Sequence, residues 1–235
     1  MKVSDFVRIK YIGKIKDDGR IIDENSDMPL VVGEKWVMSA LDDAILNMEV
    51  GDKKNVEITP DMAFGERNEK MIRTVPLTEF RKHNQKPVPG MVVNADNHLG
   101  KVLSVSGGRV KVDFNHPLSG KTLLFEVELK EKIEKNEEKV KAIMEWFMKP
   151  QNPADKEIFQ KIEIKVKGKD VEIHVPALTN LNSLYKKKIS EDVIKFLGVE
   201  KITFLEVFEK IKIDEKKIEE LNSQLPVKSI EEDNN

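Results

Sequence analysis

The chain has 235 residues, with 40 lysines and arginines against 42 aspartates and glutamates, and a formal net charge of −2. This balance argues against nucleic-acid binding and against an anionic membrane surface, because neither would be attracted by a global field. The absence of cysteine excludes disulfides, thiolate nucleophiles and cysteine-ligated metals. Since no apolar run is long enough for a signal sequence or a membrane span, we expect a soluble cytoplasmic protein with no membrane partner.

Alternating strands dominate the first half of the chain. Val7, Ile9 and Tyr11 alternate with polar side chains, which is the period-two pattern of a half-buried strand. A turn signal at 17–19 precedes a returning strand, and a clear final strand follows at 123–130.

A short helix is predicted between these strands. Ser39 and Asp42 have the spacing of a capping box at its start, and Gly51 follows its apolar face as a stop signal. One short helix against an antiparallel sheet predicts an α+β domain.

The composition changes between residues 76 and 115. A cluster of helix and strand breakers at 86–90 is followed by short strands, and the pair Gly107-Gly108 separates two of them. Two adjacent glycines favour a tight hairpin, because its turn needs positive φ angles. We interpret this segment as a small β-rich domain inserted in a loop of the first domain, since loop-closure entropy grows only slowly with loop length.

The last hundred residues have a different pattern. In chain order they predict a connecting helix at 135–149, strands at 162–166 and 171–175, a helix at 181–197, a strand near 202–204 and a last helix that includes Ile218 and Leu221. We expect a separate α+β domain here, followed by a disordered polar tail after Pro226.

Several stretches follow one another in an order that is specific as a set. They are the strand pair VRIKYIGKIKDDGRIIDEN, the passage VVGEKWVMSALDDAILNMEVGDKKNVEI, the loop DMAFGERNEKMIRTVP and the last strand LLFEVELKEKIE. Together they resemble FKBP-type peptidyl-prolyl cis–trans isomerases over roughly residues 3–134. The segment DFNHPLSGKTL is typical of the SlyD-like branch, which carries an inserted chaperone domain. The whole is most similar to long archaeal members with an additional C-terminal domain.

The resemblance implies an α+β architecture in three parts. An antiparallel FKBP sheet would wrap on a short helix, with an inserted small β-rich domain and a separate α+β C-terminal domain. We place the isomerase domain at 1–80 and 114–134, the inserted chaperone domain at 81–113, a connecting helix at 135–149, the C-terminal domain at 150–225 and a tail at 226–235.

The resemblance also implies a substrate pocket. Tyr11 and Asp23 fall on the family's tyrosine and aspartate, and we predict that they are the catalytic residues, which orient the peptide and its carbonyl. The substrate-binding residues implied by the same match are Ile22, Met28, Val37, Met38, Leu41, Phe64 and Phe125. Leu41 stands where many members have tryptophan and Phe64 replaces a common tyrosine, which argues against strong binding of macrolide inhibitors. The alternative for the apolar positions is an ordinary core.

The implied reaction needs no nucleophile, proton transfer or metal. A prolyl amide resists rotation because its carbon–nitrogen bond has partial double-bond character, with a barrier of ~20 kcal/mol. An apolar pocket disfavours the charge-separated planar amide relative to the less polar twisted one, and therefore binds the transition state better. We predict no cofactor and no metal, and proline-containing or unfolded polypeptides as partners.

The inserted domain is predicted to bind unfolded clients. It is rich in apolar residues for its length, and so small a domain cannot bury all of them. The candidate client-binding side chains are Phe80, Met91, Val93, Val102 and Val110. The alternative is that these side chains form the core of the insert.

Two other functions stay open at this point. A holdase chaperone could use the FKBP scaffold with little isomerase activity. Alternatively, the C-terminal half could be an assembly module to which the isomerase is an accessory. Its amphipathic helix and apolar hairpin predict a homodimer through the C-terminal domain.

Overall fold

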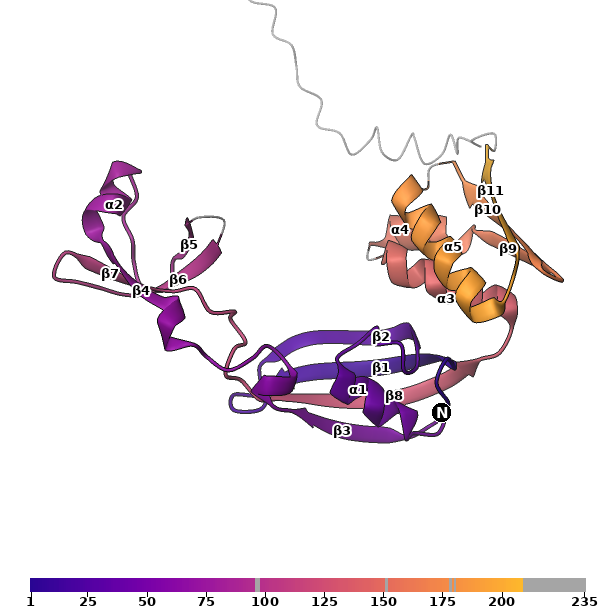
Figure 1. Cartoon of the computed structure of the whole chain (residues 1–235), viewed down its shortest axis with the longest axis horizontal. Coiled ribbons are helices and arrows are strands. Elements are labelled where there is room, and N and C mark those ends of the chain that lie inside the picture. The colour runs from indigo at the N-terminus through magenta and orange to yellow at the C-terminus, as the bar shows by residue number, and fades with distance from the viewer. Residues whose placement is uncertain (96–97, 151, 178, 180, 209–235) are drawn as a thin grey trace, which may run out of the picture.

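The computed structural model describes residues 1–95, 98–150, 152–177, 179 and 181–208. The chain forms a central part, an inserted part and a C-terminal part (Figure 1). The two outer parts rise from opposite ends of the central sheet on the same side, so the molecule is concave (Figure 1). The predicted helix with Ile218 and Leu221 and the predicted tail at 226–235 lie outside the described residues.

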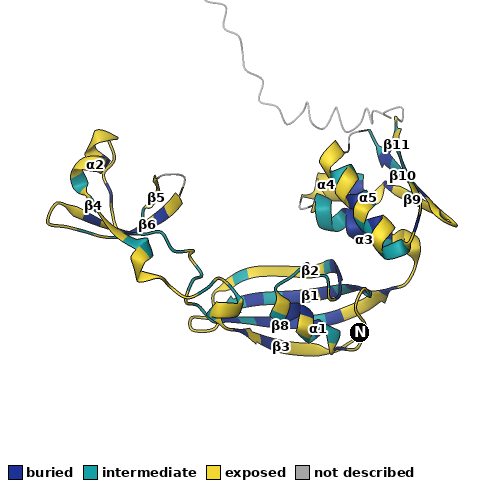
Figure 2. Cartoon of the chain, in the orientation of Figure 1, coloured by how far each residue is buried: buried dark blue, intermediate teal, exposed yellow. Residues whose placement is uncertain are grey.

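The central part is an antiparallel sheet with one helix packed on it, which confirms the predicted α+β architecture. In sheet order its strands are β2 (Ile21–Val31), β1 (Phe6–Ile15), β8 (Leu123–Ile133) and β3 (Lys53–Ile58). The helix α1 (Ser39–Leu46) buries Leu41 and Ile45 in one cluster with apolar residues of β1 and β8. Buried positions recur along β1 and β8, because alternate residues of a strand point to the same face (Figure 2).

Asp42 is not part of a capping box, contrary to the prediction. Ser39 is already helical, Met38 is the N-cap residue, and no side chain caps the helix start. The Asp42 carboxylate instead accepts hydrogen bonds from the backbone N–H groups of Gly33 and Lys35 at 2.8 and 2.9 Å. It is only 4% exposed. Asp42 therefore holds the loop before the helix rather than the helix itself.

The inserted part is a second antiparallel sheet with a core of its own. In sheet order its strands are β4 (Ile72–Pro76), β7 (Arg109–Asp113), β6 (His98–Ser106) and β5 (Val92–Ala95). The helix α2 (Leu77–Lys82) follows β4. Two 3-10 helices, η1 (Pro60–Met62) and η2 (Glu69–Met71), lie on the segment that leads from β3 to the insert. The predicted hairpin is confirmed: β6 and β7 turn at Gly107 and Gly108, whose φ angles are +55° and +72°.

The insert begins earlier in the chain than the predicted boundary at residue 81. β4 pairs with β7 from Ile72 opposite Asp113 to Pro76 opposite Arg109. β4 and most of α2 precede residue 81, yet they belong to the sheet and core of the insert. The boundary is therefore corrected to the start of β4. Local pattern could not show this, because the pairing partner of β4 lies more than thirty residues further along the chain.

The C-terminal part is a small mixed sheet covered by helices, which confirms a separate α+β unit. In sheet order its strands are β11 (Lys201–Val207), β10 (Asp170–Pro176) and β9 (Glu163–Lys167), and its helices are α3 (Asn136–Met148), α4 (Pro153–Gln160) and α5 (Ser183–Leu197). β9 and β10 form the predicted hairpin, whereas β10 and β11 are parallel and are connected through α5. None of the helices in the described ranges is long and apolar enough to cross a membrane.

The helix α3 packs the C-terminal part onto the central sheet. It contacts β2 of the central sheet as well as β9 and α5. Its residues Val140, Ile143 and Met144 share one buried cluster with Phe6 and Val31 of the central strands. The predicted connecting helix is thus also a packing element, and its position relative to the central sheet is set by a common core.

Candidate functional site

A pocket with a volume of about 910 Å³ lies between the central sheet and the C-terminal part. The apolar residues that line it on the central side include Met28, Val37, Met38, Leu41 and Phe125. All five were predicted from the sequence as substrate-binding residues. They come from β2, the loop before α1, α1 itself and β8, so the sheet and its helix together build the floor.

Tyr11 and Asp23 lie in this pocket and contact each other. The Tyr11 hydroxyl donates a hydrogen bond of 2.8 Å to the Asp23 carboxylate. Burial and the hydrogen bond to Asp23 raise the pKa of the Tyr11 hydroxyl well above its ordinary value, so it stays protonated at neutral pH. The site therefore offers a fixed polar pair beside apolar walls.

Phe125 is positioned by a glycine on the neighbouring strand. Its ring centroid lies 6.0 Å from that of Tyr11. A Cβ atom at Gly13 would lie 2.6 Å from Cε1 of Phe125, closer than side chains approach each other. Gly13 thus leaves the space that the Phe125 ring occupies on β1.

Two predicted substrate-binding residues do not line the pocket. Phe64 is 39% exposed and stacks on His116, with ring centroids 4.4 Å apart. This contact and the hydrogen bond from the Ser119 hydroxyl to the Phe64 carbonyl hold the residue on the loops that lead to the insert. Ile22 packs against the central core without reaching the pocket. In this structure the pocket wall is therefore made without either side chain.

The candidate client-binding residues of the insert also need correction. Phe80, Val93, Val102 and Val110 are all buried, with at most 8% exposed, in the core of the insert, and Met91 packs against them. Since their surface is used in holding this small sheet together, the four buried side chains do not form an exposed surface. The exposed apolar residues of the insert are others, namely Val88, Val92 and Leu99, with 57%, 63% and 67% exposed.

Sequence reasoning missed the side of the pocket that the C-terminal part supplies. Trp146 stacks on Trp36 with ring centroids 4.7 Å apart, and both line the pocket. Lys149 and Lys156 line it as well. The one available signal was that the chain has only two tryptophans, and that one of them directly precedes the predicted pocket residue Val37.

No group of three or more potential metal ligands occurs among the residues that the structure describes. The four histidines of the chain are far apart in the sequence, and His116 is engaged in the stack with Phe64. The pocket itself offers apolar walls, the Tyr11–Asp23 pair and a charged rim.

Two family models match the chain. One described as "FKBP26, IF domain" matches residues 73–118, and one described as "FKBP26_C-terminal" matches residues 136–209. The first match begins within β4, in agreement with the early start of the insert. The second begins with α3 and continues through the C-terminal part.

Three curated relatives match over 55–61% of the chain. The short-type peptidyl-prolyl cis-trans isomerase of Methanocaldococcus jannaschii is 29% identical over 148 residues, which are 56% of this chain and 93% of the relative. The FKBP-type peptidyl-prolyl cis-trans isomerase SlyD of Treponema pallidum is 34% identical over 154 residues, 61% of this chain and 86% of the relative. SlyD of Pasteurella multocida is 33% identical over 137 residues, which are 55% of this chain and 68% of the relative.

Proposed function

The chain belongs to the FKBP-type peptidyl-prolyl cis–trans isomerases, and from this membership we propose that it accelerates protein folding steps that are limited by proline isomerisation. The contact that supports this most directly is the 2.8 Å hydrogen bond from Tyr11 to Asp23 beside the apolar wall of Phe125. Uncatalysed isomerisation of an Xaa–Pro bond takes tens to hundreds of seconds, about as long as the slowest steps of folding.

The proposed mechanism is differential binding of the twisted amide. Val37, Met38 and Leu41 receive the prolyl ring and remove the amide from water, which disfavours the planar, charge-separated form. The Tyr11 hydroxyl and the Asp23 carboxylate act as fixed dipoles and charges that orient the amide and its carbonyl. No covalent bond forms or breaks in this reaction.

Replacing Asp23 by alanine is expected to lower kcat/KM for a short Xaa–Pro peptide by about tenfold, because one hydrogen bond to a charged group in a partly buried site contributes ~1.5 kcal/mol. Tyr11→Phe should have a similar effect, since it removes the same contact. The measurement is a protease-free isomerisation assay. Asp17→Ala, at an exposed turn, is the matched control. Full activity of a folded Asp23→Ala variant would remove Asp23 from the mechanism.

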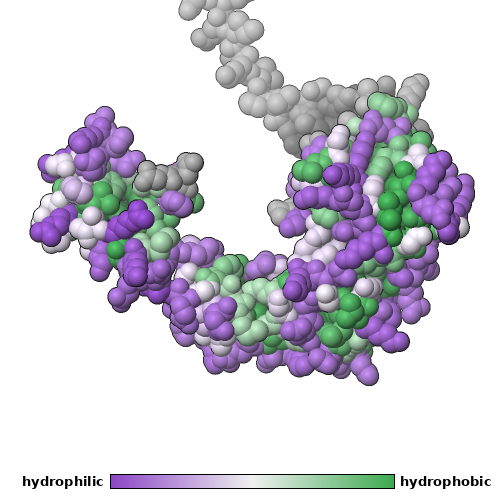
Figure 3. Space-filling model, viewed as in Figure 1, coloured by the Kyte–Doolittle hydropathy of each residue, from purple (hydrophilic) through white to green (hydrophobic). Residues whose placement is uncertain are grey.

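We further propose that the insert holds unfolded clients so that their prolines can reach the pocket. Exposed apolar surface is visible on the insert and on the central part (Figure 3). On the insert we assign this role to Val88, Val92 and Leu99, which are more than half exposed. Contiguous exposed apolar patches on a monomeric protein commonly mark sites of interaction with other proteins. A holdase with little isomerase activity is the second candidate, and a proline-peptide isomerisation assay of the wild type separates the two.

We also propose a cytoplasmic, archaeal protein that forms a homodimer through its C-terminal part. The described C-terminal residues expose apolar side chains, with Leu184 59%, Ile194 46% and Phe208 80% exposed. Burial of such residues in a second copy would stabilise a dimer by about 25 cal/mol per Å² of apolar surface. We expect twice the chain mass in sedimentation equilibrium, and a monomer at high protein concentration would contradict the proposal.

A further inference from the structure

We propose that the C-terminal part completes the substrate pocket with a subsite for an acidic residue that flanks the proline of the polypeptide. This subsite consists of Trp36, Trp146, Lys149 and Lys156, and it deepens the proposed isomerase function, on which it rests. The pocket volume of about 910 Å³ is at the upper end of the range of roughly 300–1,000 Å³ that holds whole small molecules, so a prolyl residue leaves room for its neighbours.

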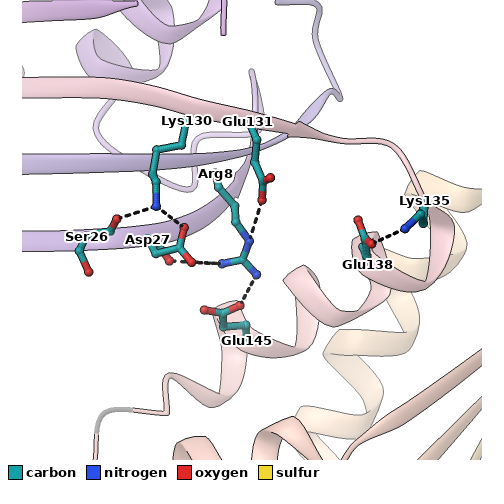
Figure 4. A network of polar contacts seen from close by, with 8 residues as sticks. All are labelled: Arg8, Ser26, Asp27, Lys130, Glu131, Lys135, Glu138 and Glu145. Atoms are coloured by element: carbon teal, nitrogen blue, oxygen red, sulfur yellow. Dashed lines mark hydrogen bonds and ion pairs between the residues drawn. The ribbon is translucent and has the colours of Figure 1, made fainter. Parts of the chain in front are cut away.

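The side of the pocket that α3 forms is held in place by an ion-pair network between α3 and the central strands (Figure 4). The Arg8 guanidinium donates to Glu145 of α3 at 2.8 Å and lies 3.2 Å from Asp27 of β2 and 3.6 Å from Glu131 of β8. Burial lowers the pKa of Arg8, but these carboxylates outweigh it, so the pKa lies above its ordinary value and the charge persists. Since Trp146 directly follows Glu145, this network fixes where the tryptophan meets the pocket.

The loop that carries Trp36 is fixed from the other side. Asp42 binds the backbone N–H groups of Gly33 and Lys35, the residues just before the tryptophan. Trp36 packs against the cores of both the central and the C-terminal parts. Glu34 in the same loop also pairs with Lys195 of α5. The tryptophan stack is therefore anchored by both parts of the chain and forms a preorganised apolar ledge at the pocket.

The charges on the two sides of the pocket are opposite. The charged lining residues are Lys10, Asp23, Glu24, Glu145, Lys149 and Lys156. On the C-terminal side Glu145 is paired with Arg8, while Lys149 and Lys156 pair with no carboxylate among the described residues. The Lys149 ammonium lies 5.4 Å from the Trp146 ring centroid, so it sits over the ledge. Asp23 and Glu24 make the β2 side acidic and repel a second carboxylate there.

This arrangement selects one class of substrate. When the proline of an extended peptide lies beside Tyr11, a neighbouring residue of the peptide faces the C-terminal part of the protein. There it meets the ammonium groups of Lys149 and Lys156, and both attract a glutamate or aspartate at that position. A lysine at that place is repelled by both. We therefore expect the enzyme to favour prolines with acidic neighbours over prolines with basic ones.

The test uses the full chain and three peptides that differ only at positions flanking one proline: glutamate, alanine or lysine. At low ionic strength we expect kcat/KM for the glutamate peptide to exceed that for the lysine peptide by about five- to tenfold. The Lys149→Glu/Lys156→Glu variant should reverse this order, because the two ammonium groups are replaced by carboxylates. In 0.5 M salt the preference should largely vanish, because the Debye length becomes shorter than the pocket.

Tryptophan fluorescence gives a second readout that does not depend on catalysis. Both tryptophans of the chain lie in the proposed subsite, so its intrinsic emission reports occupancy directly. We expect the glutamate peptide to change the emission of the wild type, and to bind the charge-reversed variant at least fivefold more weakly.

The matched control is Lys187→Glu/Lys188→Glu, which makes the same change in net charge on the exposed face of α5 outside the pocket. If this control shifts the peptide preference as much as the pocket variant does, the effect belongs to the overall field and the subsite is refuted. The subsite is equally refuted if all three peptides react at one rate. A wild type that isomerises none of them contradicts the proposed function instead.

Discussion

Removal of the insert between Met71 and Phe114 is expected to lower kcat/KM for proline-limited protein refolding by about 100-fold, while kcat/KM for a short proline peptide changes little. Holding a client on the insert raises the effective concentration of its prolines at the pocket, and such linkage contributes about 10²–10⁴-fold. The short peptide gains nothing from this, because the pocket lining contains no residue of the insert. The measurement compares kcat/KM for a refolding protein and for a tetrapeptide in the same two chains.

The structure shows where the deletion should be made. The Phe114 N–H donates to the Met71 carbonyl at 3.0 Å, and the Asn115 side chain binds the backbone of Asn68 on both its N–H and C=O groups. Met71 and Phe114 are thus adjacent, and a two-residue Asn-Gly turn can join them. A deletion that began at residue 82 would remove the strands that pair with β4 and cover Phe80. The apolar side chains left exposed could then bind clients themselves and mask the effect of the deletion.

A finer variant separates the surface of the insert from its presence. Val88→Ser, Val92→Ser and Leu99→Ser together should reproduce much of the loss in refolding catalysis and also weaken suppression of aggregation, since these side chains are exposed and the core is untouched. Val50→Ser, at a similarly exposed valine of the central part, is the control. Equal losses for the protein and the tetrapeptide would mean that the insert supports the pocket, and unchanged refolding would contradict client binding.

The central fold was predictable because its signals are local. Alternation along β1 and β8 identifies two central strands, and the order of the quoted motifs identifies the sheet, its helix and most of the apolar pocket floor. The pair Gly107-Gly108 needs positive φ angles, and so it predicts its hairpin without any tertiary information.

Two of the errors share one physical cause, which is that tertiary contacts decided between local possibilities, whereas a third has a local cause. Ser39 and Asp42 have capping-box spacing, but the Asp42 carboxylate accepts hydrogen bonds from the N–H groups of the loop at 33–35 instead of from the helix start. The helix α4 was missed, since eight residues with few apolar side chains give a weak periodicity. The contact of Trp36 with Trp146 joins positions far apart in sequence, and no local pattern contains it.

Replacing Asp42 by alanine is expected to lower the free energy of unfolding by about 3 kcal/mol, since it removes two partly buried hydrogen bonds, from the N–H groups of Gly33 and Lys35, to a charged carboxylate, and each such bond contributes about 1.5–3 kcal/mol. The strained backbone of Lys35 adds to this loss of stability, because the carboxylate holds the residue at a φ angle of +57°, which residues other than glycine seldom adopt. Urea unfolding gives the change, and Asp43→Ala, one residue on and exposed, is the control.

The same substitution also connects stability to the proposed subsite. The loop freed in Asp42→Ala carries Trp36, so the Trp36–Trp146 stack should loosen at urea concentrations below those that unfold the central sheet. Tryptophan emission would then change before the far-ultraviolet circular dichroism does, whereas the two would coincide in Asp43→Ala. Coincident transitions in both variants, with a loss below 1 kcal/mol, would show that Asp42 neither stabilises the fold nor positions the tryptophan ledge, and that α3 alone places it.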